Sequence, residues 1–218
     1  MSIKEFLISC LFPKRCILCN EVIEYDKNMC EDCTKTFSAV QIVRYIPYLN
    51  GERFVECISP FLYTGGIRQA ILRLKFHNVR SNLGFFASSI AEKILEESDI
   101  SDIDYICFVP MSERGFKNRG YNQSELLADT LGKILKIPVK NVLIKDRETF
   151  TQHELSADER SKNLLGAFSV CGNESVRNKN FILCDDIITT GSTLKECVKT
   201  LKNAGANRII CCTIASVS

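Results

Sequence analysis

Two adjacent carboxylates, Asp185 and Asp186, follow a short apolar run and precede a loop that is rich in hydroxyl groups. The loop reads Thr189-Thr190-Gly191-Ser192-Thr193. Gly191 lets the backbone turn and approach a ligand closely. The N–H groups at the start of the helix expected next are unpaired and carry partial positive charge, so they favour a phosphate. The loop therefore predicts a cradle for one phosphate group.

The two carboxylates would repel that phosphate, so they need hydroxyl donors or a hard cation as partners. A sugar diol offers O–H groups that a carboxylate pair can accept, and Mg²⁺ can be held nearby through water. A ribose 5-phosphate presents a phosphate beside a diol. The loop lacks the Gly-Lys-Ser/Thr ending of a P-loop, which argues against a nucleoside triphosphatase. The alternatives are a phospho-acceptor aspartate pair, which would leave the Thr-Gly-Ser-Thr loop without a role, and a strand end without a ligand.

A second group of residues with chemical potential is a cysteine cluster near the N-terminus. Its spacing is Cys16-x2-Cys19-x10-Cys30-x2-Cys33. Each pair places two thiolates on one tight turn, and two such turns can close a tetrahedron around Zn²⁺. The ten intervening residues carry too few apolar side chains for a core, so a metal would supply folding energy. Four thiolates leave no open position, which predicts a structural zinc; the alternative is a pair of redox dithiols.

The composition is that of a globular protein and singles out no partner. The chain has 218 residues, a formal net charge of +2 and 45% hydrophobic residues. No apolar run approaches the roughly 20 residues that span a bilayer, so no membrane insertion is expected. Apolar residues at helical spacing before Pro13 predict a short docked helix, with a targeting segment as the alternative. Twelve cysteines, several of them in apolar runs, with no secretion signal, favour a reducing cytoplasm.

The elements that would position these residues alternate between strands and helices. Buried strands are expected at 105–110, 139–144, 181–184 and 208–215, and helices after Gly65-Gly66 and at 83–97, 122–135 and 192–203. Apolar strands between helices predict a parallel sheet covered on both faces, in a doubly wound α/β domain. We expect this domain to span residues 58–218, with residues 34–58 as a transition. Residues 1–57 would then form the N-terminal helix and the four-cysteine module.

The residues from Asp185 to Thr193 resemble the signature of type I phosphoribosyltransferases, which bind phosphoribosyl pyrophosphate (PRPP). Four further segments occur in the same order: the four-cysteine cluster, ILRLKF around Lys75, FVPMSERGFKNRGYNQSELLA and TFTQHELSADERSKNLLGAF. Together they make nearly the whole chain similar to the ComF family of competence-associated, amidophosphoribosyltransferase-like proteins. Met111 departs from the pattern, which has a Val-Pro or Pro-Leu step there. The resemblance implies a type I phosphoribosyltransferase-like fold with a small N-terminal zinc ribbon.

The resemblance also implies roles for basic and hydroxyl residues outside the phosphate loop. Lys75, Ser112, Arg114 and Arg119 would bind the pyrophosphate of PRPP together with Mg²⁺. A polar stretch at 145–163 would close over the site, and its residues that match the family pattern are Arg147, Thr149, Gln152 and Arg160. The alternative for that stretch is an exposed structural loop. Asp185 and Asp186 would accept the ribose hydroxyls and orient water on the magnesium.

Two functions from different classes follow from the resemblance. The first is transfer of the 5-phosphoribosyl group from PRPP to a nitrogen nucleophile, with release of pyrophosphate. The second is a non-catalytic protein that senses PRPP or a nucleotide 5-phosphate and binds single-stranded DNA or a competence helicase. Both would be linked to DNA uptake in natural transformation. Residues 59–80 contain no acidic residue but four basic ones, which indicates either a solvated basic face or an anion site.

Overall fold

A computed structural model describes residues 13–37, 40, 42–48, 53–146, 164–172 and 176–217 of the chain. The strands are β1 (Ile42–Tyr48), β2 (Arg53–Ser59), β3 (Phe61–Leu62), β4 (Tyr105–Phe108), β5 (Leu143–Lys145), β6 (Phe168–Val170), β7 (Phe181–Ile188) and β8 (Ile209–Ser216). The helices are α2 (Glu31–Thr36), α3 (Gly65–Phe76), the 3-10 turn η2 (Arg80–Asn82), α4 (Leu83–Glu97), α5 (Glu113–Arg119), α6 (Gln123–Leu135) and α8 (Ser192–Asn203). The helix expected before Pro13 lies outside the described residues.

The centre of the fold is a sheet with the strand order β1-β2-β8-β7-β4, to which β3 is added beside β8. Strands β2, β8, β7 and β4 run parallel, and β1 is an antiparallel edge strand on β2. All eight residues of β8 and the first four of β7 are buried, as expected of parallel strands covered on both faces. The predicted doubly wound α/β fold is therefore confirmed.

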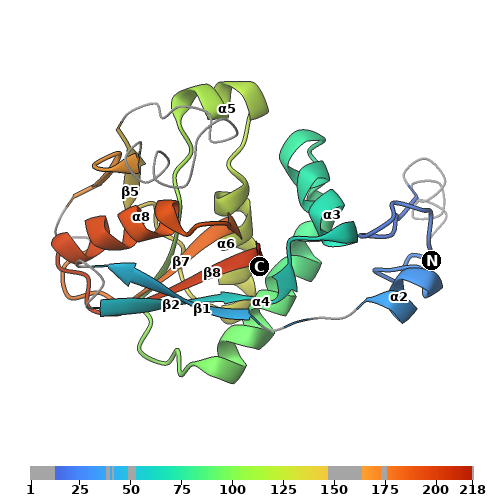
Figure 1. The fold of residues 1–218 in the computed structure, drawn as a ribbon, viewed down its shortest axis with the longest axis horizontal. Coiled ribbons are helices and arrows are strands. Elements are labelled where there is room, and N and C mark those ends of the chain that lie inside the picture. Colours follow the sequence, from blue (N-terminus) through green and yellow to red (C-terminus); the bar gives the residue numbers. More distant parts are fainter. Residues whose placement is uncertain are drawn as a thin grey trace.

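Alternate residues of β7 and β8 pack against different helical layers (Figure 1). Ile182 and Cys184 of β7 join a core cluster with buried residues of α3, α4 and α6. Phe181 and Leu183 join a second cluster with buried residues of α8 and of the β5–β6 pair. This is the period-2 alternation of a strand, which gives each face of the sheet its own core.

Two parts of the expected strand pattern were wrong. Residues 42–48 and 53–59, expected to be transitional, form the β1–β2 hairpin at the edge of the main sheet. The expected parallel strand at 139–144 contributes one bridge to the sheet, between Val139 and Ile106. The chain then leaves the sheet and forms β5, which pairs antiparallel with β6. The reason is tertiary, because Val142 and Leu143 are buried in the α8-side cluster rather than beside β4.

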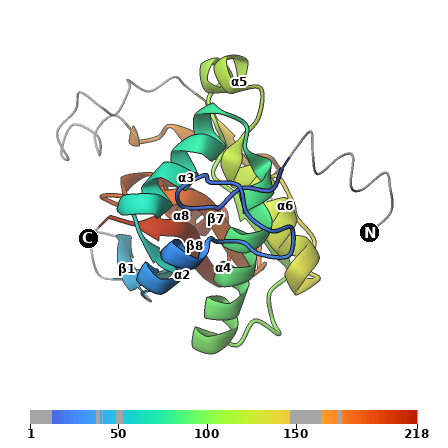
Figure 2. The ribbon, with the colours of Figure 1, turned by 90° about the vertical axis from the view of Figure 1, so that its right-hand side faces the viewer.

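The N-terminal module packs against α3, and the expected domain boundary at 57/58 falls inside β2. Figure 2 shows α2 and the segment leading to it in front of α3 and α4. Ile17 is buried in the same cluster as Ala70 and Ile71 of α3. A Cβ added at Gly66 would lie 2.7 Å from Leu18 Cβ, so only glycine allows this approach. The division into two domains remains a prediction, and no helix in the described part of the chain is long and apolar enough to cross a membrane.

Glycine plays opposite roles at two helical positions, which gives a matched test of the packing. A Cβ at Gly132 of α6 would lie 2.7 Å from Val139 Cγ2 and 2.9 Å from the Ile137 carbonyl oxygen. A Cβ at Gly84 of α4 would meet nothing within 4 Å. The segment 137–139 therefore packs on α6 more closely than any other residue type at position 132 would permit.

We predict that Gly132→Ala destabilises the protein by about 1–3 kcal/mol, because overpacking outweighs the gain in helix propensity. Gly84→Ala should stabilise it by up to about 1 kcal/mol, because only the propensity term applies there. Urea unfolding of both variants tests this. Equal effects of the two substitutions would show that α6 can move away from Val139 without loss.

Candidate functional site

The carboxylate pair lies within the second half of β7 and not beyond its end, since the strand continues to Ile188. Asp185 is opposite Thr213 of β8 in the parallel register. Ser124 Oγ, at the start of α6, donates to Asp185 Oδ1 at 2.9 Å, and the backbone N–H of Asp186 donates to the same oxygen at 2.8 Å. Lys75 Nζ of α3 lies 2.8 Å from Asp186 Oδ2. Three elements therefore meet at this pair.

Burial, and after it the negative charge of Asp186, raise the pKa of the Asp185 carboxyl to about 7. The hydrogen bonds from the Asp186 N–H and from Ser124, and the charge of Lys75, act in the opposite direction and do not outweigh the burial. Asp185 thus exchanges its proton near neutral pH, while Asp186 is held in an ion pair of which both side chains are mostly buried.

The loop after β7, which the sequence predicts to be a phosphate cradle, turns at Gly191 into α8. Gly191 has a left-handed φ of 79° and is the N-cap of α8. The hydroxyls of Thr190 and Ser192 lie 2.9 Å apart, and the Ser192 N–H donates to Thr190 Oγ1 at 3.4 Å. Thr189 and Thr190 are exposed. The loop therefore presents hydroxyl groups at the N-terminus of a 12-residue helix.

Arg44 of β1 donates a hydrogen bond to the backbone of this loop. This residue was not identified from the sequence. Its Nη1 donates to the Thr189 carbonyl oxygen at 2.6 Å and to the Val217 carbonyl oxygen at 3.3 Å. The guanidinium thus joins the phosphate loop to the end of β8. No local signal could have shown this role, because the contact spans 145 residues of sequence.

The segment after β4 forms the opposite wall. Ser112 caps the short helix α5, accepting from the Gly115 N–H at 3.2 Å. Asn122 then caps α6 and donates from Nδ2 to the Val109 carbonyl oxygen at 3.0 Å. Arg119 stacks on the Phe76 ring at 5.0 Å and donates to Gln123 Oε1 at 3.2 Å. The loop expected at 111–121 is therefore largely a helix, which fixes the polar residues on its flanks.

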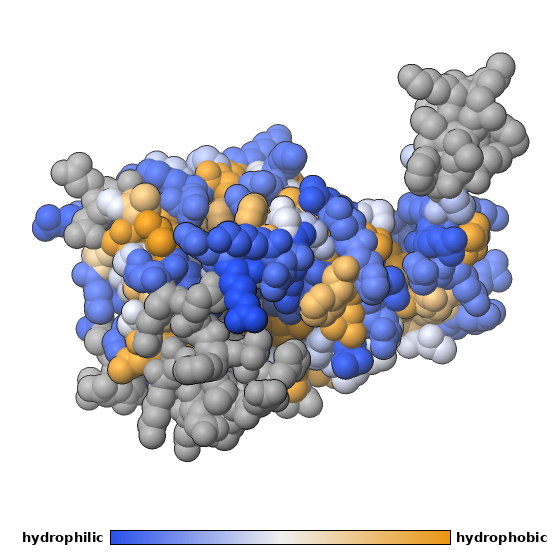
Figure 3. Space-filling model, turned by 90° about the horizontal axis from the view of Figure 1, so that it is seen from above, coloured by the Kyte–Doolittle hydropathy of each residue, from blue (hydrophilic) through white to orange (hydrophobic). Residues whose placement is uncertain are grey.

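A cleft of about 500 Å³ opens between these walls. It collects most of the residues expected to bind a phosphoribosyl ligand: Lys75, Ser112, Arg119, Asp185, Asp186, Thr189, Thr190, Gly191, Ser192 and Thr193. It is also lined by residues that sequence reasoning missed, including Tyr63, Asn122, Gln123, Ser124 and Lys145. Arg114 lies on α5 and is not among the lining residues. Arg147, Thr149, Gln152 and Arg160 lie outside the described residues. The surface on the side of α3 and α5 is mainly hydrophilic, with separate hydrophobic patches (Figure 3).

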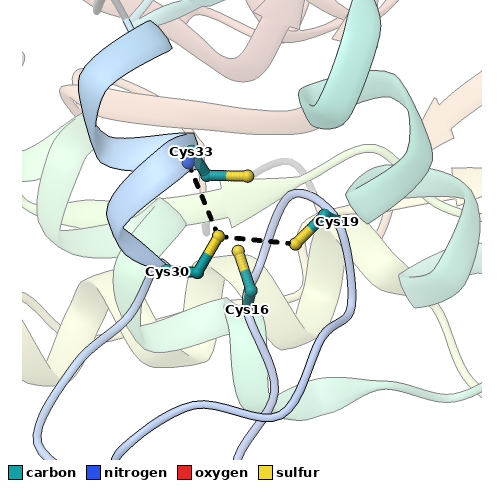
Figure 4. Close-up of side chains that lie close together, drawn as sticks. All are labelled: Cys16, Cys19, Cys30 and Cys33. Carbon is teal, nitrogen blue, oxygen red and sulfur yellow. Dashed lines mark hydrogen bonds between the residues drawn. The ribbon is translucent and has the colours of Figure 1, made fainter.

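The four cysteines converge as their spacing predicts (Figure 4). The sulfur atoms of Cys16, Cys19, Cys30 and Cys33 all lie within 4.8 Å of one another. Burial raises the pKa of the Cys16 thiol, but backbone N–H groups in the same turns outweigh it and lower the value to about 6. Burial and the neighbouring thiols raise the pKa of Cys33, so the four thiols ionise unequally. The convergence of the four sulfur atoms is what would allow the cluster to hold a metal ion.

Helix α3 joins this cluster to the cleft. The Arg73 guanidinium donates to the carbonyl oxygens of Ile17 and Leu18, the latter at 3.1 Å. These two residues lie between Cys16 and Cys19. Two positions further along the same helix, Lys75 forms its ion pair with Asp186. One helix thus contacts both groups of chemically active side chains.

Comparison with known proteins agrees with this geometry. Residues 121–218 match the family model described as "Phosphoribosyl transferase domain". DNA utilization protein YhgH of Escherichia coli is 30% identical over 201 residues, covering 88% of this chain and 85% of that protein. The chain belongs to the ComF family. Competence protein F of Haemophilus influenzae shares 42% identity with this ComF chain over 93 residues, which cover 42% of the chain and 41% of that protein. Competence protein ComFC of Streptococcus pneumoniae is 24% identical over 224 residues, covering 89% of this chain and 96% of that protein.

Solved structures match part of the chain at low identity. The "allosteric regulatory enzyme of purine biosynthesis" is 24% identical, with a TM-score of 0.39, covering 62% of this ComF chain and 25% of that enzyme. A hypoxanthine phosphoribosyltransferase from Staphylococcus aureus is 14% identical, also with a TM-score of 0.39, covering 62% of each chain. The assignment of a phosphoribosyltransferase-like fold rests on the family model and on the strand order given above, together with the clustered cysteines.

The raised pKa of Asp185 predicts a pH-dependent effect of Asp185→Asn. The folded protein keeps this proton up to about pH 7, whereas the unfolded chain loses it near its ordinary value of 3.8. Between these two pH values only the unfolded chain has lost the proton. The free energy of unfolding therefore falls as the pH rises through this range. The variant escapes this loss, so its stability relative to wild type should rise by about 1–3 kcal/mol from pH 5 to pH 8.

Urea unfolding of the two proteins at pH 5, 6, 7 and 8 measures the difference. The exposed Asp129 of α6 supplies the control, since Asp129→Asn removes a carboxylate that lies on the surface. A stability difference for Asp185→Asn that stays constant over this range would contradict the raised pKa.

Proposed function

We propose that this ComF protein binds Mg²⁺–PRPP in the cleft and transfers the 5-phosphoribosyl group to a nitrogen nucleophile, releasing pyrophosphate. One observation carries the proposal. The carboxylate pair, a lysine and a hydroxyl-rich helix N-terminus line one cleft, in a chain whose C-terminal half matches the phosphoribosyltransferase domain. The carboxylate pair matches the ribose diol of the ligand, the lysine matches its pyrophosphate, and the helix N-terminus matches its 5-phosphate.

The loop from Thr189 to Thr193 would hold the 5-phosphate by its hydroxyls and by the N-terminus of α8. Asp185 and Asp186 would accept the ribose hydroxyls, with Asp185 able to do so in its ionised form above about pH 7. Lys75, Ser112 and Arg119 would bind the pyrophosphate. The carboxylate oxygens are suitable donors for Mg²⁺, which would neutralise charge that develops on the departing pyrophosphate.

Bond cleavage at the ribose builds positive charge on the sugar and negative charge on the leaving group. Fixed charges placed on both sides lower the barrier because they need no reorganisation during the step. The carboxylates and, from the α5–α6 wall, Arg119 would supply that arrangement, while Lys75 is paired with Asp186. The nucleophile comes from the acceptor, so no covalent bond to the protein is required, and Arg147 and Arg160 would complete the site from the stretch at 145–163.

The test is calorimetric titration with PRPP, with and without Mg²⁺. Asp185→Asn combined with Asp186→Asn should weaken magnesium-dependent binding at least about tenfold, because two hydroxyl acceptors lose their charge. Glu92→Gln combined with Asp129→Asn removes the same charge from exposed sites on α4 and α6 and should leave binding unchanged. Equal affinity in both double variants would refute the assignment of the cleft.

A non-catalytic role is the second candidate, favoured by the names of the relatives, which speak of competence and DNA utilization. Such a protein would sense PRPP or a nucleotide 5-phosphate and pass the signal to single-stranded DNA or a helicase in a competent cell's cytoplasm. Pyrophosphate release with ammonia or amines as acceptors separates the two. Binding of PRPP without release favours the sensor, and release that depends on the carboxylate pair favours the enzyme.

We also propose that the cysteine cluster holds a structural Zn²⁺. The donor set fits, because four sulfur atoms converge and their geometry leaves no position for a substrate. Cys16→Ser should lose the zinc and lower the thermal midpoint, because metal binding supplies folding energy to this module. Cys171→Ser is the control, since Cys171 is an exposed cysteine outside the cluster. Metal content measured by mass spectrometry decides, and full zinc retention in Cys16→Ser would place the metal elsewhere.

A further inference from the structure

A second cavity lies at the amino ends of the parallel strands β2 and β8, whereas the carboxylate pair lies toward the carboxyl end of β7. It occupies about 340 Å³ where α8 ends, beside the end of β1 and the start of β2, on the left of Figure 1. Its charged lining residues are Arg53, Lys199 and Lys202. Three asparagines, Asn178, Asn203 and Asn207, complete its polar lining. No carboxylate lines it in the part of the chain that the structure describes.

The three cations line the same cavity, and among the described residues that line it none is acidic. Burial lowers the pKa of Lys202, and the positive charge of Arg53 lowers it further. Lys202 Nζ donates to the Asn207 carbonyl oxygen, which uses one of its three N–H groups. The C-terminus of α8 contributes only about half a negative charge, so it offsets a small part of three cations. An anion would relieve this repulsion.

The walls of the cavity are fixed by the backbone. Asn178 and Gly205 both have left-handed φ values, of 57° and 92°. The two turns that they form are joined, because the Asn178 N–H donates to the Gly205 carbonyl oxygen at 2.8 Å. The Asn207 N–H also donates to the Lys179 carbonyl oxygen, at 2.9 Å. Asn178 and Asn207 thus lie on connected turns, while Lys199 and Lys202 lie on α8 and Arg53 lies at the start of β2.

These features select a phosphate among anions. A phosphate carries up to two negative charges and three acceptor oxygens, which several separate donors can share. Arginine offers a planar fork that matches a phosphate, and asparagine amides donate to phosphates as well. Tyr48 is only 6% exposed and lies under Lys202, whose Nζ is 5.7 Å from the ring centroid. No open aromatic face is offered here for stacking a base, so the site would read the phosphate alone.

We propose that this cavity is a second anion site, which binds a phosphate group of a nucleotide or of a nucleic-acid strand through Arg53, Lys199 and Lys202. It is separate from the cleft, and it does not depend on the function proposed for the carboxylate pair. Because it recognises no base, a nucleic-acid strand would be held independently of its sequence. Its affinity would fall as salt is raised, as for other phosphate contacts.

Titration of ¹⁵N-labelled protein with inorganic phosphate, free of Mg²⁺, tests the proposal. The amide signals of Gly205 and Asn207 report on this cavity, and that of Gly191 reports on the cleft. Saturable shifts at Gly205 and Asn207 are expected in the wild type. Arg53→Gln combined with Lys199→Gln should weaken them at least about fivefold, because charge-assisted hydrogen bonds are lost. The Gly191 response should stay the same.

Lys133→Gln combined with Lys136→Gln is the control, since it removes the same charge from exposed positions at the end of α6. Absence of a saturable shift at Gly205, or equal weakening in both double variants, would overturn the proposal. Fluorescence anisotropy with a twelve-residue oligothymidylate distinguishes the two sources of phosphate. Loss of strand affinity in the Arg53/Lys199 variant alone identifies a nucleic-acid strand, and unchanged strand affinity with loss of the phosphate shifts identifies a nucleotide.

Discussion

Two neighbouring carboxylates in the second half of a buried parallel strand repel each other, and the arrangement around the cleft compensates for that repulsion. Lys75 neutralises Asp186, while Ser124 and a backbone N–H hold Asp185. These partners come from α3, α6 and β7, and the two helices pack on the same face of the sheet. The large core cluster that joins α3, α4 and α6 is therefore a requirement of the site as well as of the fold.

The cleft has two walls, one on the side of α8 and one on the side of α5 and α6. On the α8 side, Gly191 and two linked hydroxyls shape a loop that Arg44 ties to the end of β8. On the α5–α6 side, Ser112 and Asn122 cap successive helices and so hold Arg119 near Phe76. Capping residues thus determine where the ligand-facing groups lie. In a ComF protein, a ligand that bears phosphates at two ends would contact both walls at once.

The sequence could predict those features of the fold and the site that depend on residues close together in the chain. The turn at Gly191 before α8, the capping of α6 by Asn122 and the convergence of the cysteines all follow from short spacings. Arg44 and Gln123 could not be found, because one acts across 145 residues and the other lines the cleft only through the packing of α6. The strand expected at 139–144 was assigned to the wrong sheet, since an apolar run shows that residues are buried but not beside which strand. The hairpin β1–β2 was missed for the same reason.

Helix α3 has a geometric property that reaches beyond its contacts. Arg73 and Lys75 are two positions apart, which places them about 200° apart around the helix axis. One side of the helix is therefore fitted to the turn between Cys16 and Cys19, and the other to Asp186. An insertion or deletion of one residue within α3 would rotate everything beyond it by about 100° and separate the two partners. The number of residues between Arg73 and Lys75, and the rotation of the helix between them, are thus fixed by a contact at each of these two positions. Loops elsewhere can vary in length, whereas this segment cannot.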